Sequence, residues 1–335
     1  MQDKVYLIAE VGQAHEGSLG MAHSYIDALA ATGVDAVKFQ MHIADAESST
    51  HEPFRVKFSY EDETRMDYWR RMEFTPEQWR GLREHCDRAG VDFLCSPFSV
   101  AAVDLLETLE VKAYKIGSGE IANLLMLERI AQTGKPVILS SGMSDLAEID
   151  RSVKFLGERN VEIAILQCTT AYPTGPVQYG LNQIQLLKQR YGVRTGYSDH
   201  SAKPATCIAA AALGAQILEF HVVFDRAQFG PDSKSSLTMA ETAFLAQSVR
   251  DIETALAHPV DKDDISAFAD IKAMFGKSLA VNRDMGPGEV ISTSDLETKK
   301  PGGMGIPASE YESVIGKRVN RPMAKWSFLN EEDLI

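Results

Sequence analysis

The feature that most constrains this chain is an alternation of short apolar runs and helix-length segments, repeated eight times. The first run, residues 5–13, would be buried on both faces, yet it carries a carboxylate, Glu10, near its end. A lone carboxylate is costly to bury, so we expect a polar or metallic partner for it. The seven later runs lie at residues 35–40, 91–96, 113–117, 136–140, 161–167, 193–197 and 216–221.

This alternation predicts an α/β fold, a parallel (β/α)8 TIM barrel, because each crossover helix buries one side of the sheet. The expected helices lie at 19–32, 76–89, 101–110, 122–133, 146–158, 181–191, 204–213 and 239–256. Beyond about residue 275 the apolar runs shorten, and glycine and proline become frequent, which predicts a small, turn-rich β domain. We therefore predict a barrel at 1–260, a linker at 261–275 and the small domain at 276–335.

Charge and composition exclude several classes of function. The net charge of −13 over 335 residues argues against nucleic acid or an anionic membrane as a partner. We expect no membrane span and no N-terminal targeting segment, because Glu10 interrupts the only candidate for a targeting segment. The cysteines match no zinc spacing and are expected to be reduced core thiols in a cytoplasmic protein. They are Cys86, Cys95, Cys168 and Cys207.

Polar side chains follow the apolar parts of the runs, and in a barrel of this kind that face carries the active site. Serines and glycines in such places are often only turn residues. That explanation does not cover two lysines, two carboxylates and two histidines at equivalent ends. The polar residues are Glu10, Lys38, Gln40, Ser96, Lys115, Ser118, Glu120, Ser140, Tyr172, Ser198, His200 and His221.

Two histidines, His200 and His221, end consecutive runs and are therefore expected to be neighbours on the rim of the barrel. A single such histidine would more often be a hydrogen-bonded core residue. A pair can bind a divalent cation, with Glu10 or Asp232 and water completing an open shell. The pair therefore favours a metal site.

Two lysines, Lys38 and Lys115, project from the second and fourth runs into the ring of serines. Ammonium groups and hydroxyls that converge suit a ligand with both a phosphate and a carboxylate. The same lysines leave open a Schiff-base aldolase, in which one lysine is the nucleophile and the other lowers its pKa. A non-catalytic sugar-phosphate binding protein is a third hypothesis, although such a protein would gain little from two metal-binding histidines.

The motifs that carry these residues resemble those of the sialic acid synthases, which include N-acetylneuraminate, legionaminate and pseudaminate synthases and spore-coat polysaccharide synthase-like proteins. The resemblance covers the barrel in order, and the C-terminal part resembles the family's antifreeze-like (SAF) domain. The matching stretches are AEVGQAHEGSL at 9–19, VKFQ at 37–40, SPFS at 96–99, YKIGSGE at 114–120, LSSGM at 139–143, QCTTAYP at 167–173, GYSDH at 196–200, EFH at 219–221 and GPD at 230–232.

The resemblance implies a C–C bond-forming transferase that condenses phosphoenolpyruvate with an N-acylhexosamine, either N-acetylmannosamine or a 2,4-diacetamido-trideoxyhexose. The products would be a nine-carbon 2-keto-3-deoxy sugar acid and phosphate. His200 and His221 would hold Mn2+ or Mg2+ to polarise the aldehyde, and Glu10 would orient the water that adds at C2. Phosphoenolpyruvate would meet Lys38, Ser96, Lys115, Ser118, Ser140, Thr170 and Ser198, and the sugar would meet Gln40, Glu120, Tyr172 and Asp232.

The resemblance also implies a domain-swapped homodimer, in which the small domain caps the partner's barrel. In several members an arginine of this cap meets the sugar, whereas Lys300 stands in its place here and lacks the planar fork of a guanidinium. Thr170 likewise stands where some members have asparagine. The sugar therefore stays open. The long segment 42–74 is charged and has no clean period, and we hypothesise that it folds over the mouth and decides the sugar.

Overall fold

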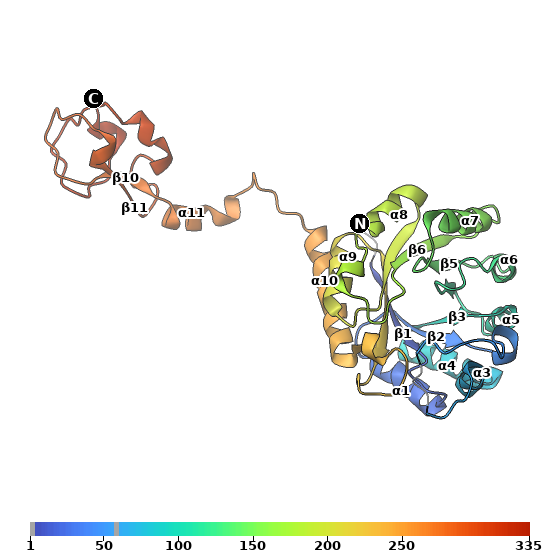
Figure 1. Cartoon of the computed structure of the whole chain (residues 1–335). Helices are drawn as coiled ribbons and strands as arrows, with labels where there is room; N and C mark the ends of the chain where they lie inside the picture. The colour runs from blue at the N-terminus through green and yellow to red at the C-terminus, as the bar shows by residue number, and fades with distance from the viewer. Residues whose placement is uncertain (1–3, 57–59) are drawn as a thin grey trace. The chain divides into compact units, whose positions relative to one another are not determined.

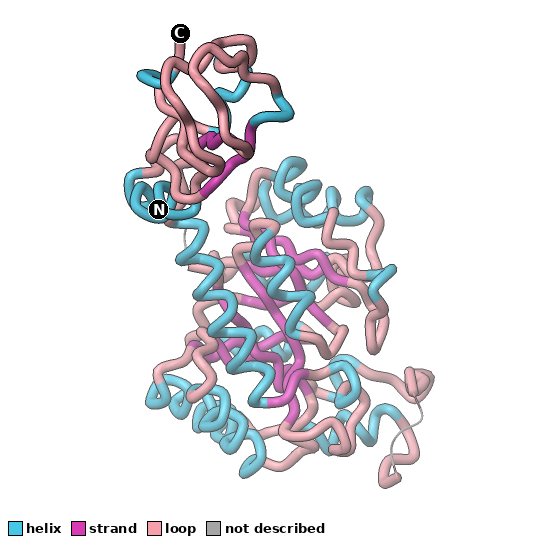
Figure 2. Tube along the Cα trace, turned by 90° about the vertical axis from the view of Figure 1, so that its left-hand side faces the viewer, coloured by secondary structure: helices cyan, strands magenta, loops and turns pink. Residues whose placement is uncertain are grey.

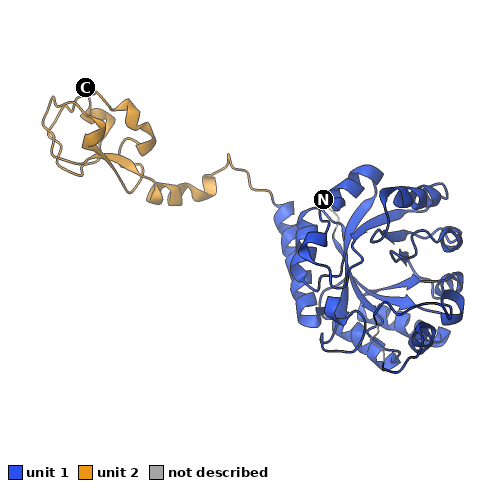
Figure 3. Cartoon of the chain, viewed as in Figure 1, with its two compact units in different colours: residues 1–258 blue, residues 259–335 orange. Residues whose placement is uncertain are grey.

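The protein is described here by a computed structural model that covers residues 4–56 and 60–335. The chain divides into two compact units, residues 1–258 and 259–335 (Figure 3). Three residues of the segment 42–74, at positions 57–59, lie outside the described residues.

The first unit is a barrel of parallel strands surrounded by helices (Figure 1). The hydrogen-bonded order is β3-β2-β1-β8-β7-β6-β5-β4, and β3 also lies against β4, so the sheet curves back on itself. The predicted (β/α)8 barrel is confirmed, and each strand falls within two residues of its predicted bounds. The strands are β1 (Tyr6–Gly12), β2 (Ala36–Met41), β3 (Asp92–Pro97), β4 (Tyr114–Ile116), β5 (Val137–Ser140), β6 (Ile163–Cys168), β7 (Arg194–Asp199) and β8 (Ile217–Val223), with a short β9 (Leu237–Thr238) beside β8.

The helices pack on the outside of the strands (Figure 2). Local signals set their ends: Thr75 and Thr238 each form a capping box at a helix start, and Gly90 adopts a left-handed conformation where α4 ends. None of the helices in the described parts of the chain combines the length and hydrophobicity that would span a bilayer. The barrel helices are α1 (Leu19–Ala30), α4 (Pro76–Ala89), α5 (Val100–Thr108), α6 (Leu124–Ala131), α7 (Leu146–Gly157), α8 (Gln183–Tyr191), α9 (Pro204–Ala212) and α10 (Met239–Ala257).

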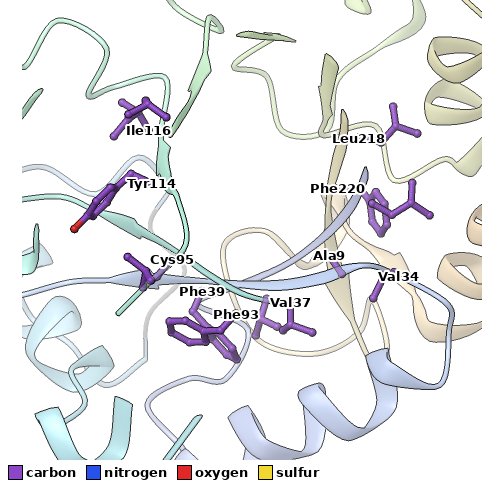
Figure 4. Close-up of a cluster of buried hydrophobic side chains, with 14 of the residues drawn as sticks. Ala9, Val34, Val37, Phe39, Phe93, Cys95, Tyr114, Ile116, Leu218 and Phe220 are labelled. Carbon is purple, nitrogen blue, oxygen red and sulfur yellow. The ribbon is translucent and has the colours of Figure 1, made fainter. Parts of the chain in front are cut away.

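The strands bury both of their faces. Outward side chains such as Phe39, Phe93 and Phe220 pack in the layer between strands and helices (Figure 4). Inward side chains form a second apolar cluster inside the barrel, which includes Ile8 and Ile217. The four cysteines are buried with free thiols, as predicted.

Successive side chains of a strand point to opposite faces, so residues two positions apart point to the same face. Two residues beyond an inward-facing apolar residue, the next inward-facing side chain therefore lies closer to the carboxyl end of the strand. Ile8 is thus followed by Glu10, and Ile217 by Glu219 and then His221. The period of the strands places an apolar plug below and a polar layer above it, at the carboxyl ends of the strands.

The segment 42–74 has its own small core. It contains two helices, α2 (Ala44–Glu47) and α3 (Arg65–Met72). Thr64 and Asp67 form a capping box at the start of α3. Tyr68, Trp69 and Met72 of α3 are buried together with Ala44, so this connection is folded rather than irregular.

The second unit is small and turn-rich, as predicted. It contains a short helical turn, η3 (Ser266–Phe268), α11 (Ala269–Phe275) and an antiparallel pair, β10 (Ser278–Val281) and β11 (Leu296–Lys299). Its core is separate from that of the barrel and includes Leu279 and Val314.

The interior of the barrel leaves no room for a side chain at Gly196 of β7. A Cβ atom there would lie 2.6 Å from Leu166 Cδ2 and closer still to the carbonyl oxygen of Ile217. We expect Gly196→Ala to lower the free energy of unfolding by about 1–3 kcal/mol, because overpacking forces neighbours to shift. Urea unfolding followed by circular dichroism would measure this. Gly157→Ala at the end of α7 is the control, because nothing lies within 4 Å of its added Cβ, and equal midpoints for the two variants would contradict the prediction.

Candidate active site

A cavity of about 490 Å³ lies at the carboxyl ends of the barrel strands. It brings together every predicted site residue except Lys300, which belongs to the second unit. The residues gathered there are Glu10, Lys38, Gln40, Ser96, Lys115, Ser118, Glu120, Ser140, Thr170, Tyr172, Ser198, His200, His221 and Asp232.

Strand register explains why these side chains meet. On β1, Glu10 pairs with Lys38 of β2 on one side and with His221 of β8 on the other. On β7, Ser198 pairs with Glu219 of β8. The polar layer is therefore a direct consequence of parallel pairing between inward-facing positions.

Four charged side chains form a buried ionic cluster in this layer, hereafter the ionic cluster: Glu10, Lys38, Lys115 and Glu219. Lys38 Nζ is ion-paired with Glu10 Oε2 and lies 3.8 Å from Glu219 Oε2, and Lys115 Nζ lies 3.3 Å from Glu219 Oε1. Both lysines are only 2% exposed. Glu219 was assigned no role in the sequence analysis, although it lies two residues before His221 and so shares its face of β8.

Burial and charge act in opposite directions on the ionic cluster. Burial lowers the pKa of Lys38 to about 8, against the opposing effect of Glu219. Burial also opposes ionisation of Glu219, but Lys115 and Lys38 together lower its pKa to about 2. At neutral pH the cluster therefore contains ionised groups of both signs away from water.

Hydroxyl groups extend the cluster toward the cavity. Lys38 Nζ donates to Ser96 Oγ at 3.1 Å, and Lys115 Nζ donates to Ser140 Oγ at 2.7 Å. Ser118 Oγ accepts from the backbone N–H of Gly142 at 3.0 Å. Ammonium and hydroxyl donors thus converge, which suits a ligand with several anionic oxygens.

The two histidines lie side by side at the rim, with ring centroids 5.3 Å apart. His200 Nδ1 donates to the Thr169 carbonyl at 2.9 Å, which leaves the Nε2 lone pair of His200 available. Burial lowers the pKa of His221 to about 4, so its imidazole is neutral at physiological pH, as a metal ligand must be.

A buried carboxylate oxygen, Glu10 Oε1, has no hydrogen-bond partner within the described residues. A Cβ atom built on Gly12 would lie 3.4 Å from this oxygen and 3.6 Å from His221 Cε1, so both border the same space. An unpartnered carboxylate oxygen beside the His221 imidazole offers two of the ligand types that a divalent cation binds. No group of three or more His, Cys, Asp or Glu in residues 4–56 and 60–335 is arranged to hold a metal, so other ligands would have to complete the shell.

Several residues of the segment 42–74 line the cavity, and one of them, His42, belongs to a chain of hydrogen-bonded polar side chains. The His42 ring stacks between two aromatic rings, with its centroid 3.7 Å from that of Trp69 and 4.4 Å from that of Phe98. His42 Nδ1 lies 2.6 Å from Glu47 Oε1. On its other side, His42 Nε2 lies 2.9 Å from Gln13 Nε2, which also donates to Gln40 Oε1. This hydrogen-bond chain from Glu47 through His42 and Gln13 therefore orients the Gln40 amide. The sequence analysis missed His42, although it follows Gln40 by two positions.

Arg55 of the same segment was also missed, because the segment has no period that would place it. Its guanidinium donates to Asp232 Oδ1 at 2.6 Å and lies 4.0 Å from the centroid of the Tyr172 ring. The segment thus lies at the mouth, as hypothesised, and whether it decides the sugar stays a prediction. Nearby, burial raises the pKa of Glu120 and of Tyr172.

The low pKa of Glu219 makes a prediction about acid stability. Because its folded-state pKa of about 2 is below the ordinary 4.5, its stabilisation is complete above about pH 4.5 and is lost as the pH falls toward 2. We expect the difference in unfolding free energy between the wild type and Glu219→Gln to be constant from about pH 7 to 5, and to shrink by about 3 kcal/mol at most below that.

Urea unfolding across this pH range measures that difference. Glu158→Gln is the control, because its carboxylate is 59% exposed beside Lys154. A difference for Glu219→Gln that is independent of pH would argue against the assigned ionisation.

Comparison with known proteins gives the family. Residues 25–261 match the NeuB family, and residues 276–334 match the SAF domain. The N,N'-diacetyllegionaminic acid synthase of Campylobacter jejuni is 36% identical over 94% of this chain and 95% of its own length. The human N-acetylneuraminate-9-phosphate synthase is 31% identical over 95% of this chain and 89% of its own length.

A solved structure gives the same result. The N-acetylneuraminic acid synthetase from Leptospira borgpetersenii, in complex with citrate, aligns with a TM-score of 0.71 and 30% identity. The alignment covers 81% of this chain and 91% of that chain. The chain therefore belongs to the NeuB family and carries a SAF domain, in agreement with the resemblance of its motifs to those of sialic acid synthases.

Proposed function

We propose that this protein condenses phosphoenolpyruvate with the aldehyde of an N-acylhexosamine, giving a nine-carbon 2-keto-3-deoxy sugar acid and phosphate. The acceptor would be N-acetylmannosamine or a 2,4-diacetamido-trideoxyhexose. The observation that carries the proposal is one cavity that holds two buried ammonium groups, their serine partners and two adjacent imidazoles in a NeuB family chain. The Campylobacter relative, named an N,N'-diacetyllegionaminic acid synthase, and the human relative, named an N-acetylneuraminate-9-phosphate synthase, support the same reaction class.

Phosphoenolpyruvate would bind at the ionic cluster. Its phosphate and carboxylate would accept charge-assisted hydrogen bonds from Lys38 and Lys115, whose charged forms the glutamates favour. Further hydroxyl donors would come from the strand ends and loops that line the same space. They are Ser96, Ser118, Ser140, Thr170 and Ser198.

His200 and His221 would hold Mn2+ or Mg2+, which when bound supplies Lewis-acid polarisation of the aldehyde oxygen. Glu10 would use its unpartnered Oε1 to orient the water that adds at C2 of the condensing substrate. The phosphate then leaves by cleavage of its C–O bond. The donors and acceptors for the sugar would come from Gln40, Glu120, Tyr172 and Asp232, which line the same cavity.

A Schiff-base aldolase is the second candidate, because burial lowers the pKa of Lys38 to about 8 and so favours a neutral amine. Against it, both lysines have glutamate partners that favour the charged form. Borohydride trapping with a carbonyl substrate would reveal an imine, and chelation would not inhibit such an enzyme.

The first test is release of phosphate from phosphoenolpyruvate with each candidate sugar, with Mn2+ and then with EDTA. We expect release to need both the sugar and the metal. His221→Ala should reduce turnover by more than about 100-fold, because the variant loses one of the two proposed metal ligands. His258→Ala is the control and should leave turnover unchanged, because His258 is exposed. Metal-independent turnover, or a fully active His221→Ala variant, would contradict the proposed mechanism.

We also propose a homodimer in which the SAF domain of one chain caps the barrel of the other, so that Lys300 reaches the sugar bound there. The proposed bounds are 1–260 for the barrel, 261–275 for the linker and 276–335 for the SAF domain. The support is an exposed apolar stretch that a partner would cover. Lys300 itself lies over the Phe275 ring, 4.8 Å from its centroid. The exposed residues are Val260, Ile265, Phe268, Ile271, Met274 and Phe275, at 45–73%.

Mixed dimers test this arrangement. Lys300→Glu damages only the cap, and His221→Ala damages only the barrel, so each variant alone should be weak. Coexpression of the two should recover roughly a quarter of the wild-type rate, since half of the random dimers are hybrids with one complete site. Activity equal to the sum of the separate variants would mean that each cap serves its own chain or none.

A further inference from the structure

We infer that the barrel carries a second binding site, at the end opposite the candidate active site, and that this site takes an α-amino acid with an apolar side chain. The site is a cavity of about 200 Å³, hereafter the amino-end cavity. Every barrel strand except β2 contributes a residue that begins the strand or directly precedes it. Of the described residues that line this cavity, none lines the candidate active site. The inference therefore does not depend on the proposed function.

Short side chains leave this space open. The layers inside a barrel are usually filled by Val, Ile and Leu, whereas the apolar cluster inside this barrel includes Ala164 of β6 and Ala113, just before β4. Ile138 and Ala164 of that cluster line the amino-end cavity and keep 8% and 7% of their surface exposed. Since an apolar cavity of about 150 Å³ can hold benzene, this one has room for a branched aliphatic side chain or a phenyl ring.

Two side chains of opposite charge at the mouth of the amino-end cavity are unpaired. Arg194 begins β7 and Glu162 directly precedes β6, and both are exposed and line the cavity. Across residues 4–56 and 60–335, neither side chain has an ion pair or a hydrogen bond. Arg194 pairs in register with Ala164, two residues beyond Glu162, so the two charges lie on neighbouring strands.

The other charged groups at this mouth already have partners. Lys112 Nζ lies 2.5 Å from Asp92 Oδ1, and Tyr6 donates to Asp92 Oδ2 at 2.8 Å. An incoming ligand therefore meets one free cation and one free anion, Arg194 and Glu162. Exposed charges are ordinarily solvated and need no partner. The feature that distinguishes this pair is the apolar cavity that both charges border.

An α-amino acid matches this arrangement of charges and apolar surface. Its carboxylate would accept hydrogen bonds from the planar guanidinium of Arg194, and its ammonium would donate to Glu162. Its side chain would enter the cavity and contact Ala164, Ile138 and Ile217. A simple fatty acid would leave Glu162 without a partner, and a simple amine would leave Arg194 without one.

Isothermal titration calorimetry with L-leucine and L-phenylalanine tests the inference. We expect saturable binding of at least one of them, and binding at least about tenfold weaker for leucinamide and for 4-methylpentanoate, because each analogue lacks one charged group. No saturable binding of either amino acid up to about 10 mM would overturn the inference. Binding of 4-methylpentanoate as tight as that of leucine would overturn the choice of an amino acid.

Two variants locate the bound amino acid. Ala164→Leu fills the cavity and should abolish binding, and Arg194→Gln should weaken it by at least about tenfold. Arg194 is exposed, so its replacement keeps the test valid if Ala164→Leu does not fold, which circular dichroism would show. Arg151→Gln is the matched control, because Arg151 is exposed on α7 and does not line the cavity. Undiminished binding in Arg194→Gln, or in a folded Ala164→Leu, would overturn the inference.

Discussion

The ionic cluster inside the barrel is the interaction on which the rest of the site depends. Two ammonium groups buried to 2% exposure would be strongly destabilising alone, and Glu10 and Glu219 make them tolerable. A buried ion pair contributes little net stability compared with apolar packing. Its value lies in holding Lys38 and Lys115 charged and oriented, so that an anionic substrate meets preformed donors rather than flexible side chains.

This cluster can form because the two-residue period of the strands separates an apolar layer inside the barrel from the polar layer above it. Ile8, two residues before Glu10, and Ile217, two residues before Glu219, lie in the apolar plug below the charges. The plug excludes water from one side, and the cavity opens on the other. The geometry of the charged groups is therefore as rigid as the backbone pairing of β1, β2 and β8.

Sequence patterns could predict the part of the site that strand period controls. The eight apolar runs became the eight strands, and Lys38 and His221 were found because they end such runs. Glu219 was missed because its importance arises from contact with lysines on other strands, which no local pattern encodes. His42 and Arg55 were missed for a different reason: they lie in a segment without a period, whose position depends on its own small core around Trp69.

The residues that could be predicted and those that could not belong to two different parts of the cavity. The half that would bind phosphoenolpyruvate takes both lysines and most of its serines from strands, whose register cannot shift without breaking the barrel. The half that would bind the acceptor takes Glu47, Glu52, Arg55 and Arg65 from one local segment. Substitutions there can change charge and shape without disturbing the ionic cluster. This arrangement agrees with the hypothesis that the segment 42–74 decides the sugar, because the segment can change while the strand residues of the ionic cluster stay in place.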